Sequence, residues 1–407
     1  MTKKHKDHKP TLSADAQERV RLPVCSPDDA ILPEPTPGMD RLRELAAKTH
    51  TLLSIQLNVT QRCNLFCRHC YRAPEQVAPC PDPTTRELVD IMEQAHELGA
   101  LFVAFSGGEP LLRPDWVELF QEARRLKMGT TLMTNGTLLD EKAIQKLVDL
   151  NPGRVQISLY GAKASTHDWV TRTPGSYSKA LAVVESLAAH GLKVSVVGVV
   201  MRQNAKEIKV FFEWGQSIGA DVGVNLRMMP RLDGQVDETD LFVLQSQLKP
   251  LFEIPDLKSG IRVGTQDTDE IWKNLSYCTA GASSLCVNSD LTVWPCTSLP
   301  VELGRLDKEQ TLEEIWKDSL FLKEFQALRR GKDLQECRTC EYRLSCSRCP
   351  GAAMLAGHTI HGREPEFCKV AKVLHELKEE HKKQQGLSEE RRSTPRFAAA
   401  GDHRKTH

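Results

Sequence analysis

Apolar residues recur along the chain in two alternating patterns, one with a period of two and one with the spacing of an amphipathic helix. The run at 52–59 has the first pattern, because Ile55, Leu57 and Val59 alternate with polar residues, as in a strand. The segment 85–98 has the second, and Gly99 follows it as a stop signal. Further strands are expected at 101–105, 130–133, 155–159, 194–200 and 222–228. Further helices are expected at 115–126, 140–150, 178–189 and 204–218. Six such repeats predict an α/β fold with a parallel sheet and right-handed crossovers.

The pattern weakens at both ends of this core. The predicted division of the chain is a polar, partly disordered lead-in (1–48), the α/β core (49–235), a connecting segment (236–277), a cysteine-rich domain (278–370) and a tail that starts helical and becomes disordered (371–407). We also expect helices at 39–48, 238–251 and 311–316 and a strand at 260–263.

Composition narrows the class of protein. The chain has 407 residues, 40% of them hydrophobic, and a formal net charge of zero, so nothing global favours nucleic acid or a membrane surface as a partner. No apolar run approaches the ~18 residues of a membrane span, and no secretory signal follows the basic start. Thirteen cysteines in such a chain indicate a cytoplasmic protein with metal ligands and argue against disulfides.

The densest group of candidate metal ligands lies directly after the first strand. Cys63, Cys67 and Cys70 can place three thiolates around one metal centre. Three ligands on a four-iron cluster leave one iron open to a small molecule. Taken alone, the triplet is also compatible with zinc or with redox-active thiols.

Two later motifs decide between these interpretations. Ser106-Gly107-Gly108-Glu109-Pro110 ends the second strand and Thr134-Asn135-Gly136 ends the third. Together with the cysteine loop, they resemble the radical S-adenosylmethionine enzymes in order and spacing. The resemblance implies a partial (β/α)6 TIM-like barrel, open on one side, with its site at the C-terminal ends of the strands. It also implies a 4Fe–4S cluster whose open iron binds S-adenosylmethionine, reductive cleavage to a 5′-deoxyadenosyl radical, and hydrogen abstraction from a substrate.

The same resemblance assigns the other cofactor-binding candidates. Gly107, Gly108 and Glu109 are expected near the methionine amino group, with Asn135 at a neighbouring strand end. Ser158 and Arg172 are expected at the ribose and carboxylate, although a surface role for Arg172 is equally compatible. His69 precedes the third cysteine and is either an adenine contact or a loop-packing residue.

Tyr160 is the candidate catalytic residue. Sulfatase-maturing relatives have an aspartate base after Ser-Leu, whereas this chain reads Ser158-Leu159-Tyr160. The departure disfavours formylglycine formation but leaves a tyrosine that can exchange a proton or a hydrogen atom. The following His167 and Asp168 are expected to have a structural capping role.

Eight cysteines return near the C-terminal end, enough for two fully ligated cubanes. They are Cys278, Cys286, Cys296, Cys337, Cys340, Cys346, Cys349 and Cys368. Their spacing resembles the SPASM extension of this superfamily, which implies one or two auxiliary 4Fe–4S clusters. The turn at Asp290-Leu291 lacks the usual glycine, and the gap between Cys346 and Cys349 is one residue shorter than the commonest form. Structural zinc sites are the alternative.

The resemblance favours an oxidoreductase that matures a ribosomal peptide or a protein side chain, with flavodoxin or ferredoxin as electron donor. The alternative is a small-molecule enzyme, such as a haem-biosynthesis oxidative decarboxylase or a cofactor or aminoglycoside enzyme. A non-enzymatic cluster protein would leave the Gly-Gly-Glu-Pro site without a task.

Overall fold

The core strands pair in sequence order, each parallel to the next, as predicted for a partial barrel. They are β1 (Ser54–Thr60), β2 (Phe102–Gly107), β3 (Gly129–Thr134), β4 (Arg154–Ser158), β5 (Val194–Val199) and β6 (Asp221–Asn225). The structure is a computed structural model that describes residues 37–72, 80–233, 239–254, 257, 273, 278–307 and 309–384. The expectations for 1–36, 260–263 and 385–407 lie outside these residues.

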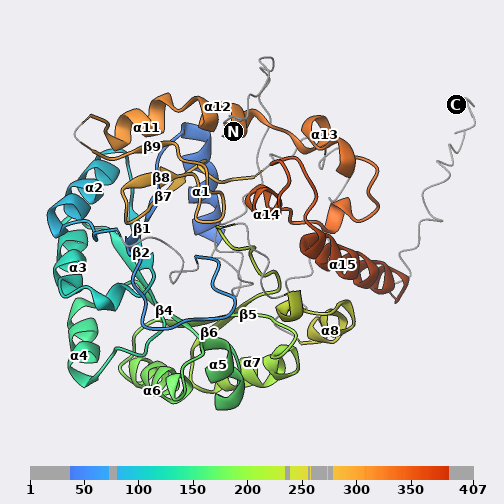
Figure 1. Cartoon of the computed structure of the whole chain (residues 1–407), viewed down its shortest axis with the longest axis horizontal. Helices are drawn as coiled ribbons and strands as arrows, with labels where there is room; N and C mark the ends of the chain where they lie inside the picture. Colours follow the sequence, from blue (N-terminus) through green and yellow to red (C-terminus); the bar gives the residue numbers. More distant parts are fainter. Residues whose placement is uncertain are drawn as a thin grey trace, which may run out of the picture.

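A helix follows each of the first five strands and covers the outer face of the sheet. These are α2 (Thr85–Glu97), α3 (Trp116–Arg125), α4 (Glu141–Leu150), α6 (Ser176–Ala189) and α7 (Ile208–Ser217). Short 3-10 turns lie at η1 (Pro110–Leu112) and η2 (Ala205–Glu207). Figure 1 shows the helices as an arc around the strands, with the C-terminal part of the chain on the remaining side. α2 shows how the local sequence fixes the start of a helix, because Thr84 and Glu87 form a reciprocal capping box there.

Two elements differ from expectation. α5 (Ala164–Thr171) occupies a stretch for which we predicted no helix. Its N-cap residue, Lys163, makes no side-chain cap hydrogen bond, so the sequence contains no local signal for the start of this helix. The helix instead depends on the burial of Val170 and His167. The helix expected at 238–251 is divided into η3 (Thr239–Leu241) and α8 (Gln245–Leu251).

The cysteine-rich part continues the same sheet. β7 (Ser284–Val287) pairs in parallel with β1, and β8 (Thr292–Trp294) and β9 (Gly304–Arg305) extend it antiparallel. Within the described residues the strand order is therefore β6-β5-β4-β3-β2-β1-β7-β8-β9. In the turn before β8, Leu291 has a φ of 66°, the left-handed region that favours the glycine this sequence lacks there.

Short helices complete the C-terminal part. They are α11 (Leu312–Asp318), α12 (Leu320–Ala327), α13 (Arg330–Asp333), η4 (Gln335–Cys337), η5 (Arg343–Ser345), α14 (Pro350–Leu355) and the longer α15 (Pro365–Gln384). The expected helix near the start is α1 (Pro37–Thr49). None of the helices in the described ranges is long and apolar enough to cross a membrane.

One large hydrophobic core lies between the sheet and its helices. Leu57, Phe105 and Leu132 on adjacent strands are at most 1% exposed, and the core extends to Trp316 in α11 and Val373 in α15. A separate small cluster packs against Cys278, Cys296 and Cys337 and consists of Ala280, Leu299, Phe325 and Leu334. The barrel thus has its own extensive core, whereas the segment 320–363 adds Leu322 to that core and otherwise packs on the smaller cluster.

Candidate active site

The three cysteines of the first loop lie together at the C-terminal end of β1. The loop is held against the end of α5, because the backbone N–H groups of Phe66 and Arg68 donate to the carbonyls of Thr171 (3.3 Å) and Val170 (2.9 Å). Burial raises the pKa of the Cys63 thiol to about 11, and the neighbouring Cys70 adds to the shift. The pKa of Cys67 is raised by burial and then by Cys70 and Cys63. These mutual effects mean that the three sulfurs lie near one another, and their binding of one metal centre stays a prediction.

Asparagine side chains tie this loop to the end of β3. Asn135 Nδ2 donates to Asn64 Oδ1 at 2.9 Å, and Asn64 Nδ2 donates to Thr137 Oγ1 at 2.8 Å. Asn64 lies directly after Cys63, so these bonds fix the loop that carries the thiols. The structure therefore gives Asn135 a positioning role, and its predicted cofactor contact stays a prediction.

Gly107 and Gly108 bring the end of β2 against the entrance of the cysteine loop. A Cβ at Gly108 would lie 2.2 Å from the carbonyl oxygen of Arg62, and one at Gly107, where φ is +130°, would lie 2.4 Å from that of Thr60. No side chain fits at either position. The chain itself thus requires both glycines, and their approach to S-adenosylmethionine stays a prediction.

Glu109 is fully buried beside these glycines. Its Oε1 accepts from Thr134 Oγ1 (2.7 Å) and from the backbone N–H of Leu111 (3.1 Å), and its Oε2 accepts from the N–H of Asn135 (2.8 Å). Burial raises the pKa of its carboxyl, and these hydrogen bonds oppose the rise. The carboxylate uses three of about four acceptor positions, which leaves one for a ligand.

An aromatic row runs from the cysteine loop across β4. The ring of His69 packs edge-on against Tyr160 with centroids 4.3 Å apart, and Tyr160 stacks on His167 at 5.6 Å. Desolvation raises the pKa of Tyr160 well above its ordinary value, Cys67 adds to this, and a hydrogen bond with Ser158 opposes it. Within the described residues, His69 Nδ1 and His167 Nε2 are buried without a hydrogen-bond partner. Unpartnered buried polar atoms beside three thiols fit a site that holds a bound group.

Arg172 and Asp168 lie at the end of α5, the helix against which the cysteine loop is held. Arg172 is an exposed residue in a left-handed conformation at the end of α5 (φ 56°), and its charge lowers the pKa of Cys67. Asp168 accepts from the backbone N–H groups of Gly175 (2.7 Å) and Tyr177 (2.8 Å) at the start of α6. The structural capping role predicted for Asp168 is confirmed.

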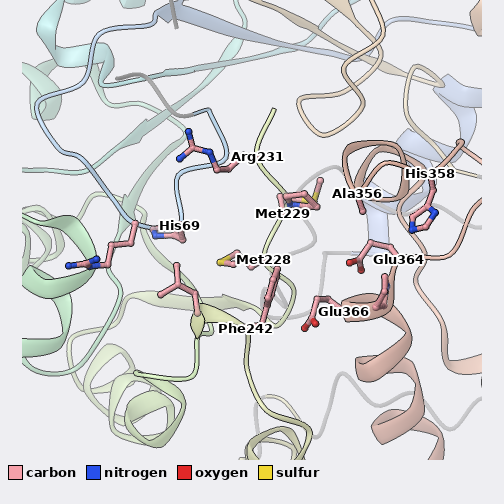
Figure 2. Close-up of a pocket in the computed structure, with 13 residues that line it drawn as sticks. His69, Met228, Met229, Arg231, Phe242, Ala356, His358, Glu364 and Glu366 are labelled. Atoms are coloured by element: carbon pink, nitrogen blue, oxygen red, sulfur yellow. The ribbon is translucent and has the colours of Figure 1, made fainter. Parts of the chain in front are cut away.

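A cavity of about 230 Å³ opens beside His69. It lies between the cysteine loop, the segment after β6 and the start of α15 (Figure 2). Its apolar surface comes from residues that include Met228, Met229 and Phe242. Figure 2 shows the side chains of Glu364 and Glu366 on the opposite wall. The cavity thus adjoins both the cysteine loop after β1 and the cysteine-rich part of the chain.

Four of the later cysteines surround a second cavity, of about 170 Å³. They are Cys337, Cys340, Cys346 and Cys368, and we call them the second cysteine set. Burial raises the pKa of Cys346 to about 11; Arg330 opposes the shift, and Cys368 and Cys337 add to it. The set is interleaved in sequence with Cys349, which does not line this cavity.

The other four cysteines, Cys278, Cys286, Cys296 and Cys349, form the first cysteine set. Burial raises the pKa of Cys296 to about 11, and the charge of Cys349 adds to it. Burial also raises the pKa of Cys286 to about 12, Arg72 opposes this, and Cys296 adds to it. A hydrogen bond of 3.0 Å from the N–H of Gly281 to the carbonyl of Pro295 joins the Cys278 turn to the Cys296 turn.

No group of three or more His, Cys, Asp or Glu side chains in the described ranges is arranged to hold a single metal ion. A cubane differs from a single ion because each of its cysteines binds a different iron. The twelve described cysteines are all free thiols. Cys80 belongs to none of these groups of cysteines, and its side chain is half-buried.

Sequence reasoning missed several residues at these sites. Asn58, a buried residue on β1, donates to Cys286 Sγ at 3.1 Å and so connects the barrel to the cysteine-rich part. The sequence analysis also missed Asn64, whose side-chain hydrogen bonds hold the cysteine loop against the end of β3. Four arginines that line the second cavity were also missed, although the density of arginine between residues 329 and 348 was a visible signal.

Comparison with known proteins agrees with this arrangement. The model of the Radical SAM superfamily matches residues 57–215, and that of the SPASM iron–sulfur cluster-binding domain matches residues 278–341. An AdoMet-dependent heme synthase of Methanosarcina barkeri is 28% identical and covers 80% of this chain and 98% of its own length. A PqqA peptide cyclase of Gluconobacter oxydans is 29% identical over 71% of this chain and 82% of its own length.

Solved structures share the fold. Streptococcus suis SuiB bound to S-adenosylmethionine has a TM-score of 0.61 at 17% identity and covers 81% of each chain. SuiB bound to its precursor peptide SuiA has a TM-score of 0.60 at 17% identity, covering 81% of this chain and 80% of that one. The shared fold spans both the barrel and the cysteine-rich part.

Proposed function

The chain belongs to the radical S-adenosylmethionine superfamily and carries a SPASM domain, and from this premise we propose that it matures a ribosomally made peptide or a protein side chain. Its first domain binds a 4Fe–4S cluster with S-adenosylmethionine, and its SPASM domain binds auxiliary iron–sulfur clusters. When bound, the first cluster and S-adenosylmethionine supply a 5′-deoxyadenosyl radical that abstracts hydrogen from the substrate.

The likeness to peptide-modifying proteins carries the choice of substrate class. The cavity beside His69, whose lining includes the apolar residues Met228, Met229 and Phe242, is the proposed place of the substrate side chain. Named relatives that act on peptides support this choice. The heme synthase relative, which matches over nearly its whole length, supports the alternative of a haem-biosynthesis decarboxylase.

The residues around this cavity have distinct proposed tasks. Cys63, Cys67 and Cys70 hold the catalytic cluster, while Asn64 and Asn135 fix their loop. Gly107, Gly108 and Glu109 bind the methionine part of S-adenosylmethionine, since they lie at the strand ends beside the thiols. Ser158 and Arg172 are proposed for its ribose and carboxylate, and His69 for its adenine, because His69 Nδ1 is buried without a partner within the described residues.

Tyr160 is the proposed catalytic residue. Its ring lies between His69 and His167, and its hydroxyl remains protonated because desolvation raises its pKa. Tyr160 does not line the cavity but packs on His69, which does, and a neutral phenol in this place can donate a proton to a substrate that reaches it. Replacing Tyr160 by phenylalanine should keep S-adenosylmethionine binding and reduce product formation.

We further propose two auxiliary clusters, one held by each cysteine set. The cavity of the second set and the mutual electrostatic effects within each set support this division. A flavodoxin or ferredoxin is the proposed electron donor, and the cytoplasm is the proposed compartment because it keeps thiols reduced.

Two measurements test the proposal. The reconstituted protein should hold roughly twelve irons, falling to roughly eight when Cys63, Cys67 and Cys70 are replaced by alanine, with cleavage of S-adenosylmethionine abolished. Zinc in place of iron would contradict it. Incubation with candidate short peptides should give products that have lost hydrogen or a residue by mass spectrometry. An unchanged peptide together with a decarboxylated porphyrin would instead establish the haem alternative.

A further inference from the structure

The cavity beside His69 has different chemistry on its two sides. Figure 2 shows His69 on one side and the side chains of Glu364 and Glu366 on the other, with their carboxylates directed into the space between. That space is bounded by apolar side chains, which are Met228, Met229 and Phe242. A group that extends from the cysteine loop across the cavity therefore passes apolar side chains and ends at two carboxylates.

Glu364 is the more buried of these two residues. It is only 6% exposed, and its Oε2 accepts from the backbone N–H of Phe367 (2.7 Å) in the first turn of α15. Burial raises the pKa of its carboxyl; the N–H groups of Phe367 and Glu366 oppose the rise, the charge of Glu366 adds to it and that of Lys369 opposes it. Among the described residues no basic side chain forms an ion pair with Glu364. A buried carboxylate held by neutral N–H groups is stabilised when a cation enters the same cavity.

Glu366 already has a cation beside it. Its Oε2 lies 2.5 Å from Nζ of Lys369, one turn further along α15. The same ammonium group donates to the carbonyl of Val243 at 3.0 Å, so two contacts hold the lysine in place. The charge of Glu366 is therefore balanced within the chain, and Glu364 is the carboxylate that has capacity for an incoming positive group.

Two arginines also line this cavity, and both are engaged away from Glu364. Arg231 donates to the two carboxylate oxygens of Asp233, at 3.2 Å from Nε and 2.8 Å from Nη2. Figure 2 shows its guanidinium group turned away from the glutamates. Arg68 lies over the ring of Trp169 at 4.3 Å and donates to the carbonyl of that residue at 3.1 Å. The negative end of the cavity is thus at the start of α15.

We propose that this cavity takes a peptide residue with an apolar stem and a cationic end, and that Glu364 selects it by pairing with the cation. Lysine fits this description best, because its four-carbon stem ends in a compact positive charge. The stem lies against the two methionines and Phe242, with carbon atoms toward His69 and the cysteine loop. The inference rests on the proposed function and deepens it, because it names the class of residue that the peptide must present.

The test measures binding to the reconstituted full chain by equilibrium dialysis. The probes are acetylated and amidated Gly-X-Gly tripeptides in which X is lysine, norleucine or glutamate. The lysine probe should bind about tenfold tighter than the norleucine probe, which has the same stem without the charge. Glu364→Gln keeps an oxygen for the N–H of Phe367, so it should remove this preference and leave the norleucine affinity unchanged. Glu380→Gln, an exposed position further along α15 and outside the cavity, is the matched control and should have no effect.

Equal binding of the lysine and norleucine probes to the wild-type chain would overturn the inference, and this comparison needs no variant to fold. Tighter binding of the glutamate probe would also overturn it, because the arginines would then select the substrate. A lysine preference that persists in Glu364→Gln would overturn the role of Glu364. The proposed function fails separately: binding needs no radical, so a lysine preference without any modified peptide would contradict maturation and not this inference. A matured peptide whose modified residue carries no positive charge would do the reverse.

Discussion

The barrel and the segment 320–363 are stabilised in different ways. The barrel strands and helices bury a continuous apolar core, and Cys63, Cys67 and Cys70 follow β1 at its rim. The segment 320–363 consists of short helices, such as the four-residue α13 and the six-residue α14, over a small cluster around Phe325 and Leu334. We expect ligation of the auxiliary cluster to supply much of the folding free energy of this segment, because its own apolar cluster is small.

The difference teaches that cysteines can serve chemistry in one region and folding in another. Loss of the catalytic cluster should leave a folded barrel, because Leu57, Phe105 and Leu132 remain buried without it. Loss of an auxiliary cluster should disorder the segment around it. Three sets of substitutions and one change of pH test this difference between the two regions.

Removal of ligands from the second set should have the largest effect. Replacing Cys337 and Cys340 by alanine costs on the order of several kcal/mol of local stability, because the site no longer binds its cluster. Limited proteolysis should then cut within residues 320–363 while the barrel stays intact. The matched variant, with Cys63 and Cys67 replaced by alanine, should resist proteolysis throughout. Equal digestion of the two variants would contradict the comparison.

Two glycines give the next largest effects, one in each region. A Cβ at Gly108 would meet the carbonyl oxygen of Arg62 at 2.2 Å, and one at Gly351 would meet that of Ser298 at 1.6 Å. Either alanine should cost ~1–3 kcal/mol through backbone displacement. Gly108→Ala should reduce cleavage of S-adenosylmethionine at least tenfold, and Gly351→Ala should reduce auxiliary iron content. Gly38→Ala, with nothing within 4 Å, is the control.

Two asparagines give a smaller and more selective effect. Asn135→Ala removes the bond to Asn64 and should cost ~1 kcal/mol, with faster loss of catalytic iron during gel filtration. Asn58 lies on β1 of the barrel, yet its amide donates to Cys286. Asn58→Ala should therefore change an auxiliary paramagnetic signal and leave the catalytic one unaltered. A change confined to the catalytic signal would show that Asn58 acts within its own region.

The smallest effect is the pH dependence of barrel stability. Burial lowers the pKa of His167 from its usual 6.5 to about 4, so the folded state disfavours the charged imidazole. The stabilisation is fully present above pH 6.5 and is lost as the pH falls toward 4, since only the unfolded chain takes up the proton. Urea unfolding should show a loss of ~1 kcal/mol between pH 7.5 and 5.5 from this group. His167→Gln should flatten the slope, whereas exposed His190→Gln should not.

The regular part of the fold was predictable because its signals are local. Each predicted core strand and helix recurs within a few residues of its expected bounds, since the periods of two and 3.6 residues persist along each element. The proximity of Cys63, Cys67 and Cys70 was equally predictable, because all three lie in one loop. The helix α5 was missed, since its burial of Val170 is a tertiary effect without a cap in the sequence.

The sequence by itself determined the barrel, the place of Cys63, Cys67 and Cys70 and the number of later cysteines, because these follow from short-range spacing. Only the tertiary structure decided how those cysteines divide. Cys349 joins the set of Cys296 although Cys346 and Cys368, on either side of it in the chain, line the other cavity. It also decided that β7 pairs with β1 and that Asn58 of β1 donates a hydrogen bond to Cys286. These contacts join residues far apart in the chain, so no local pattern specifies them.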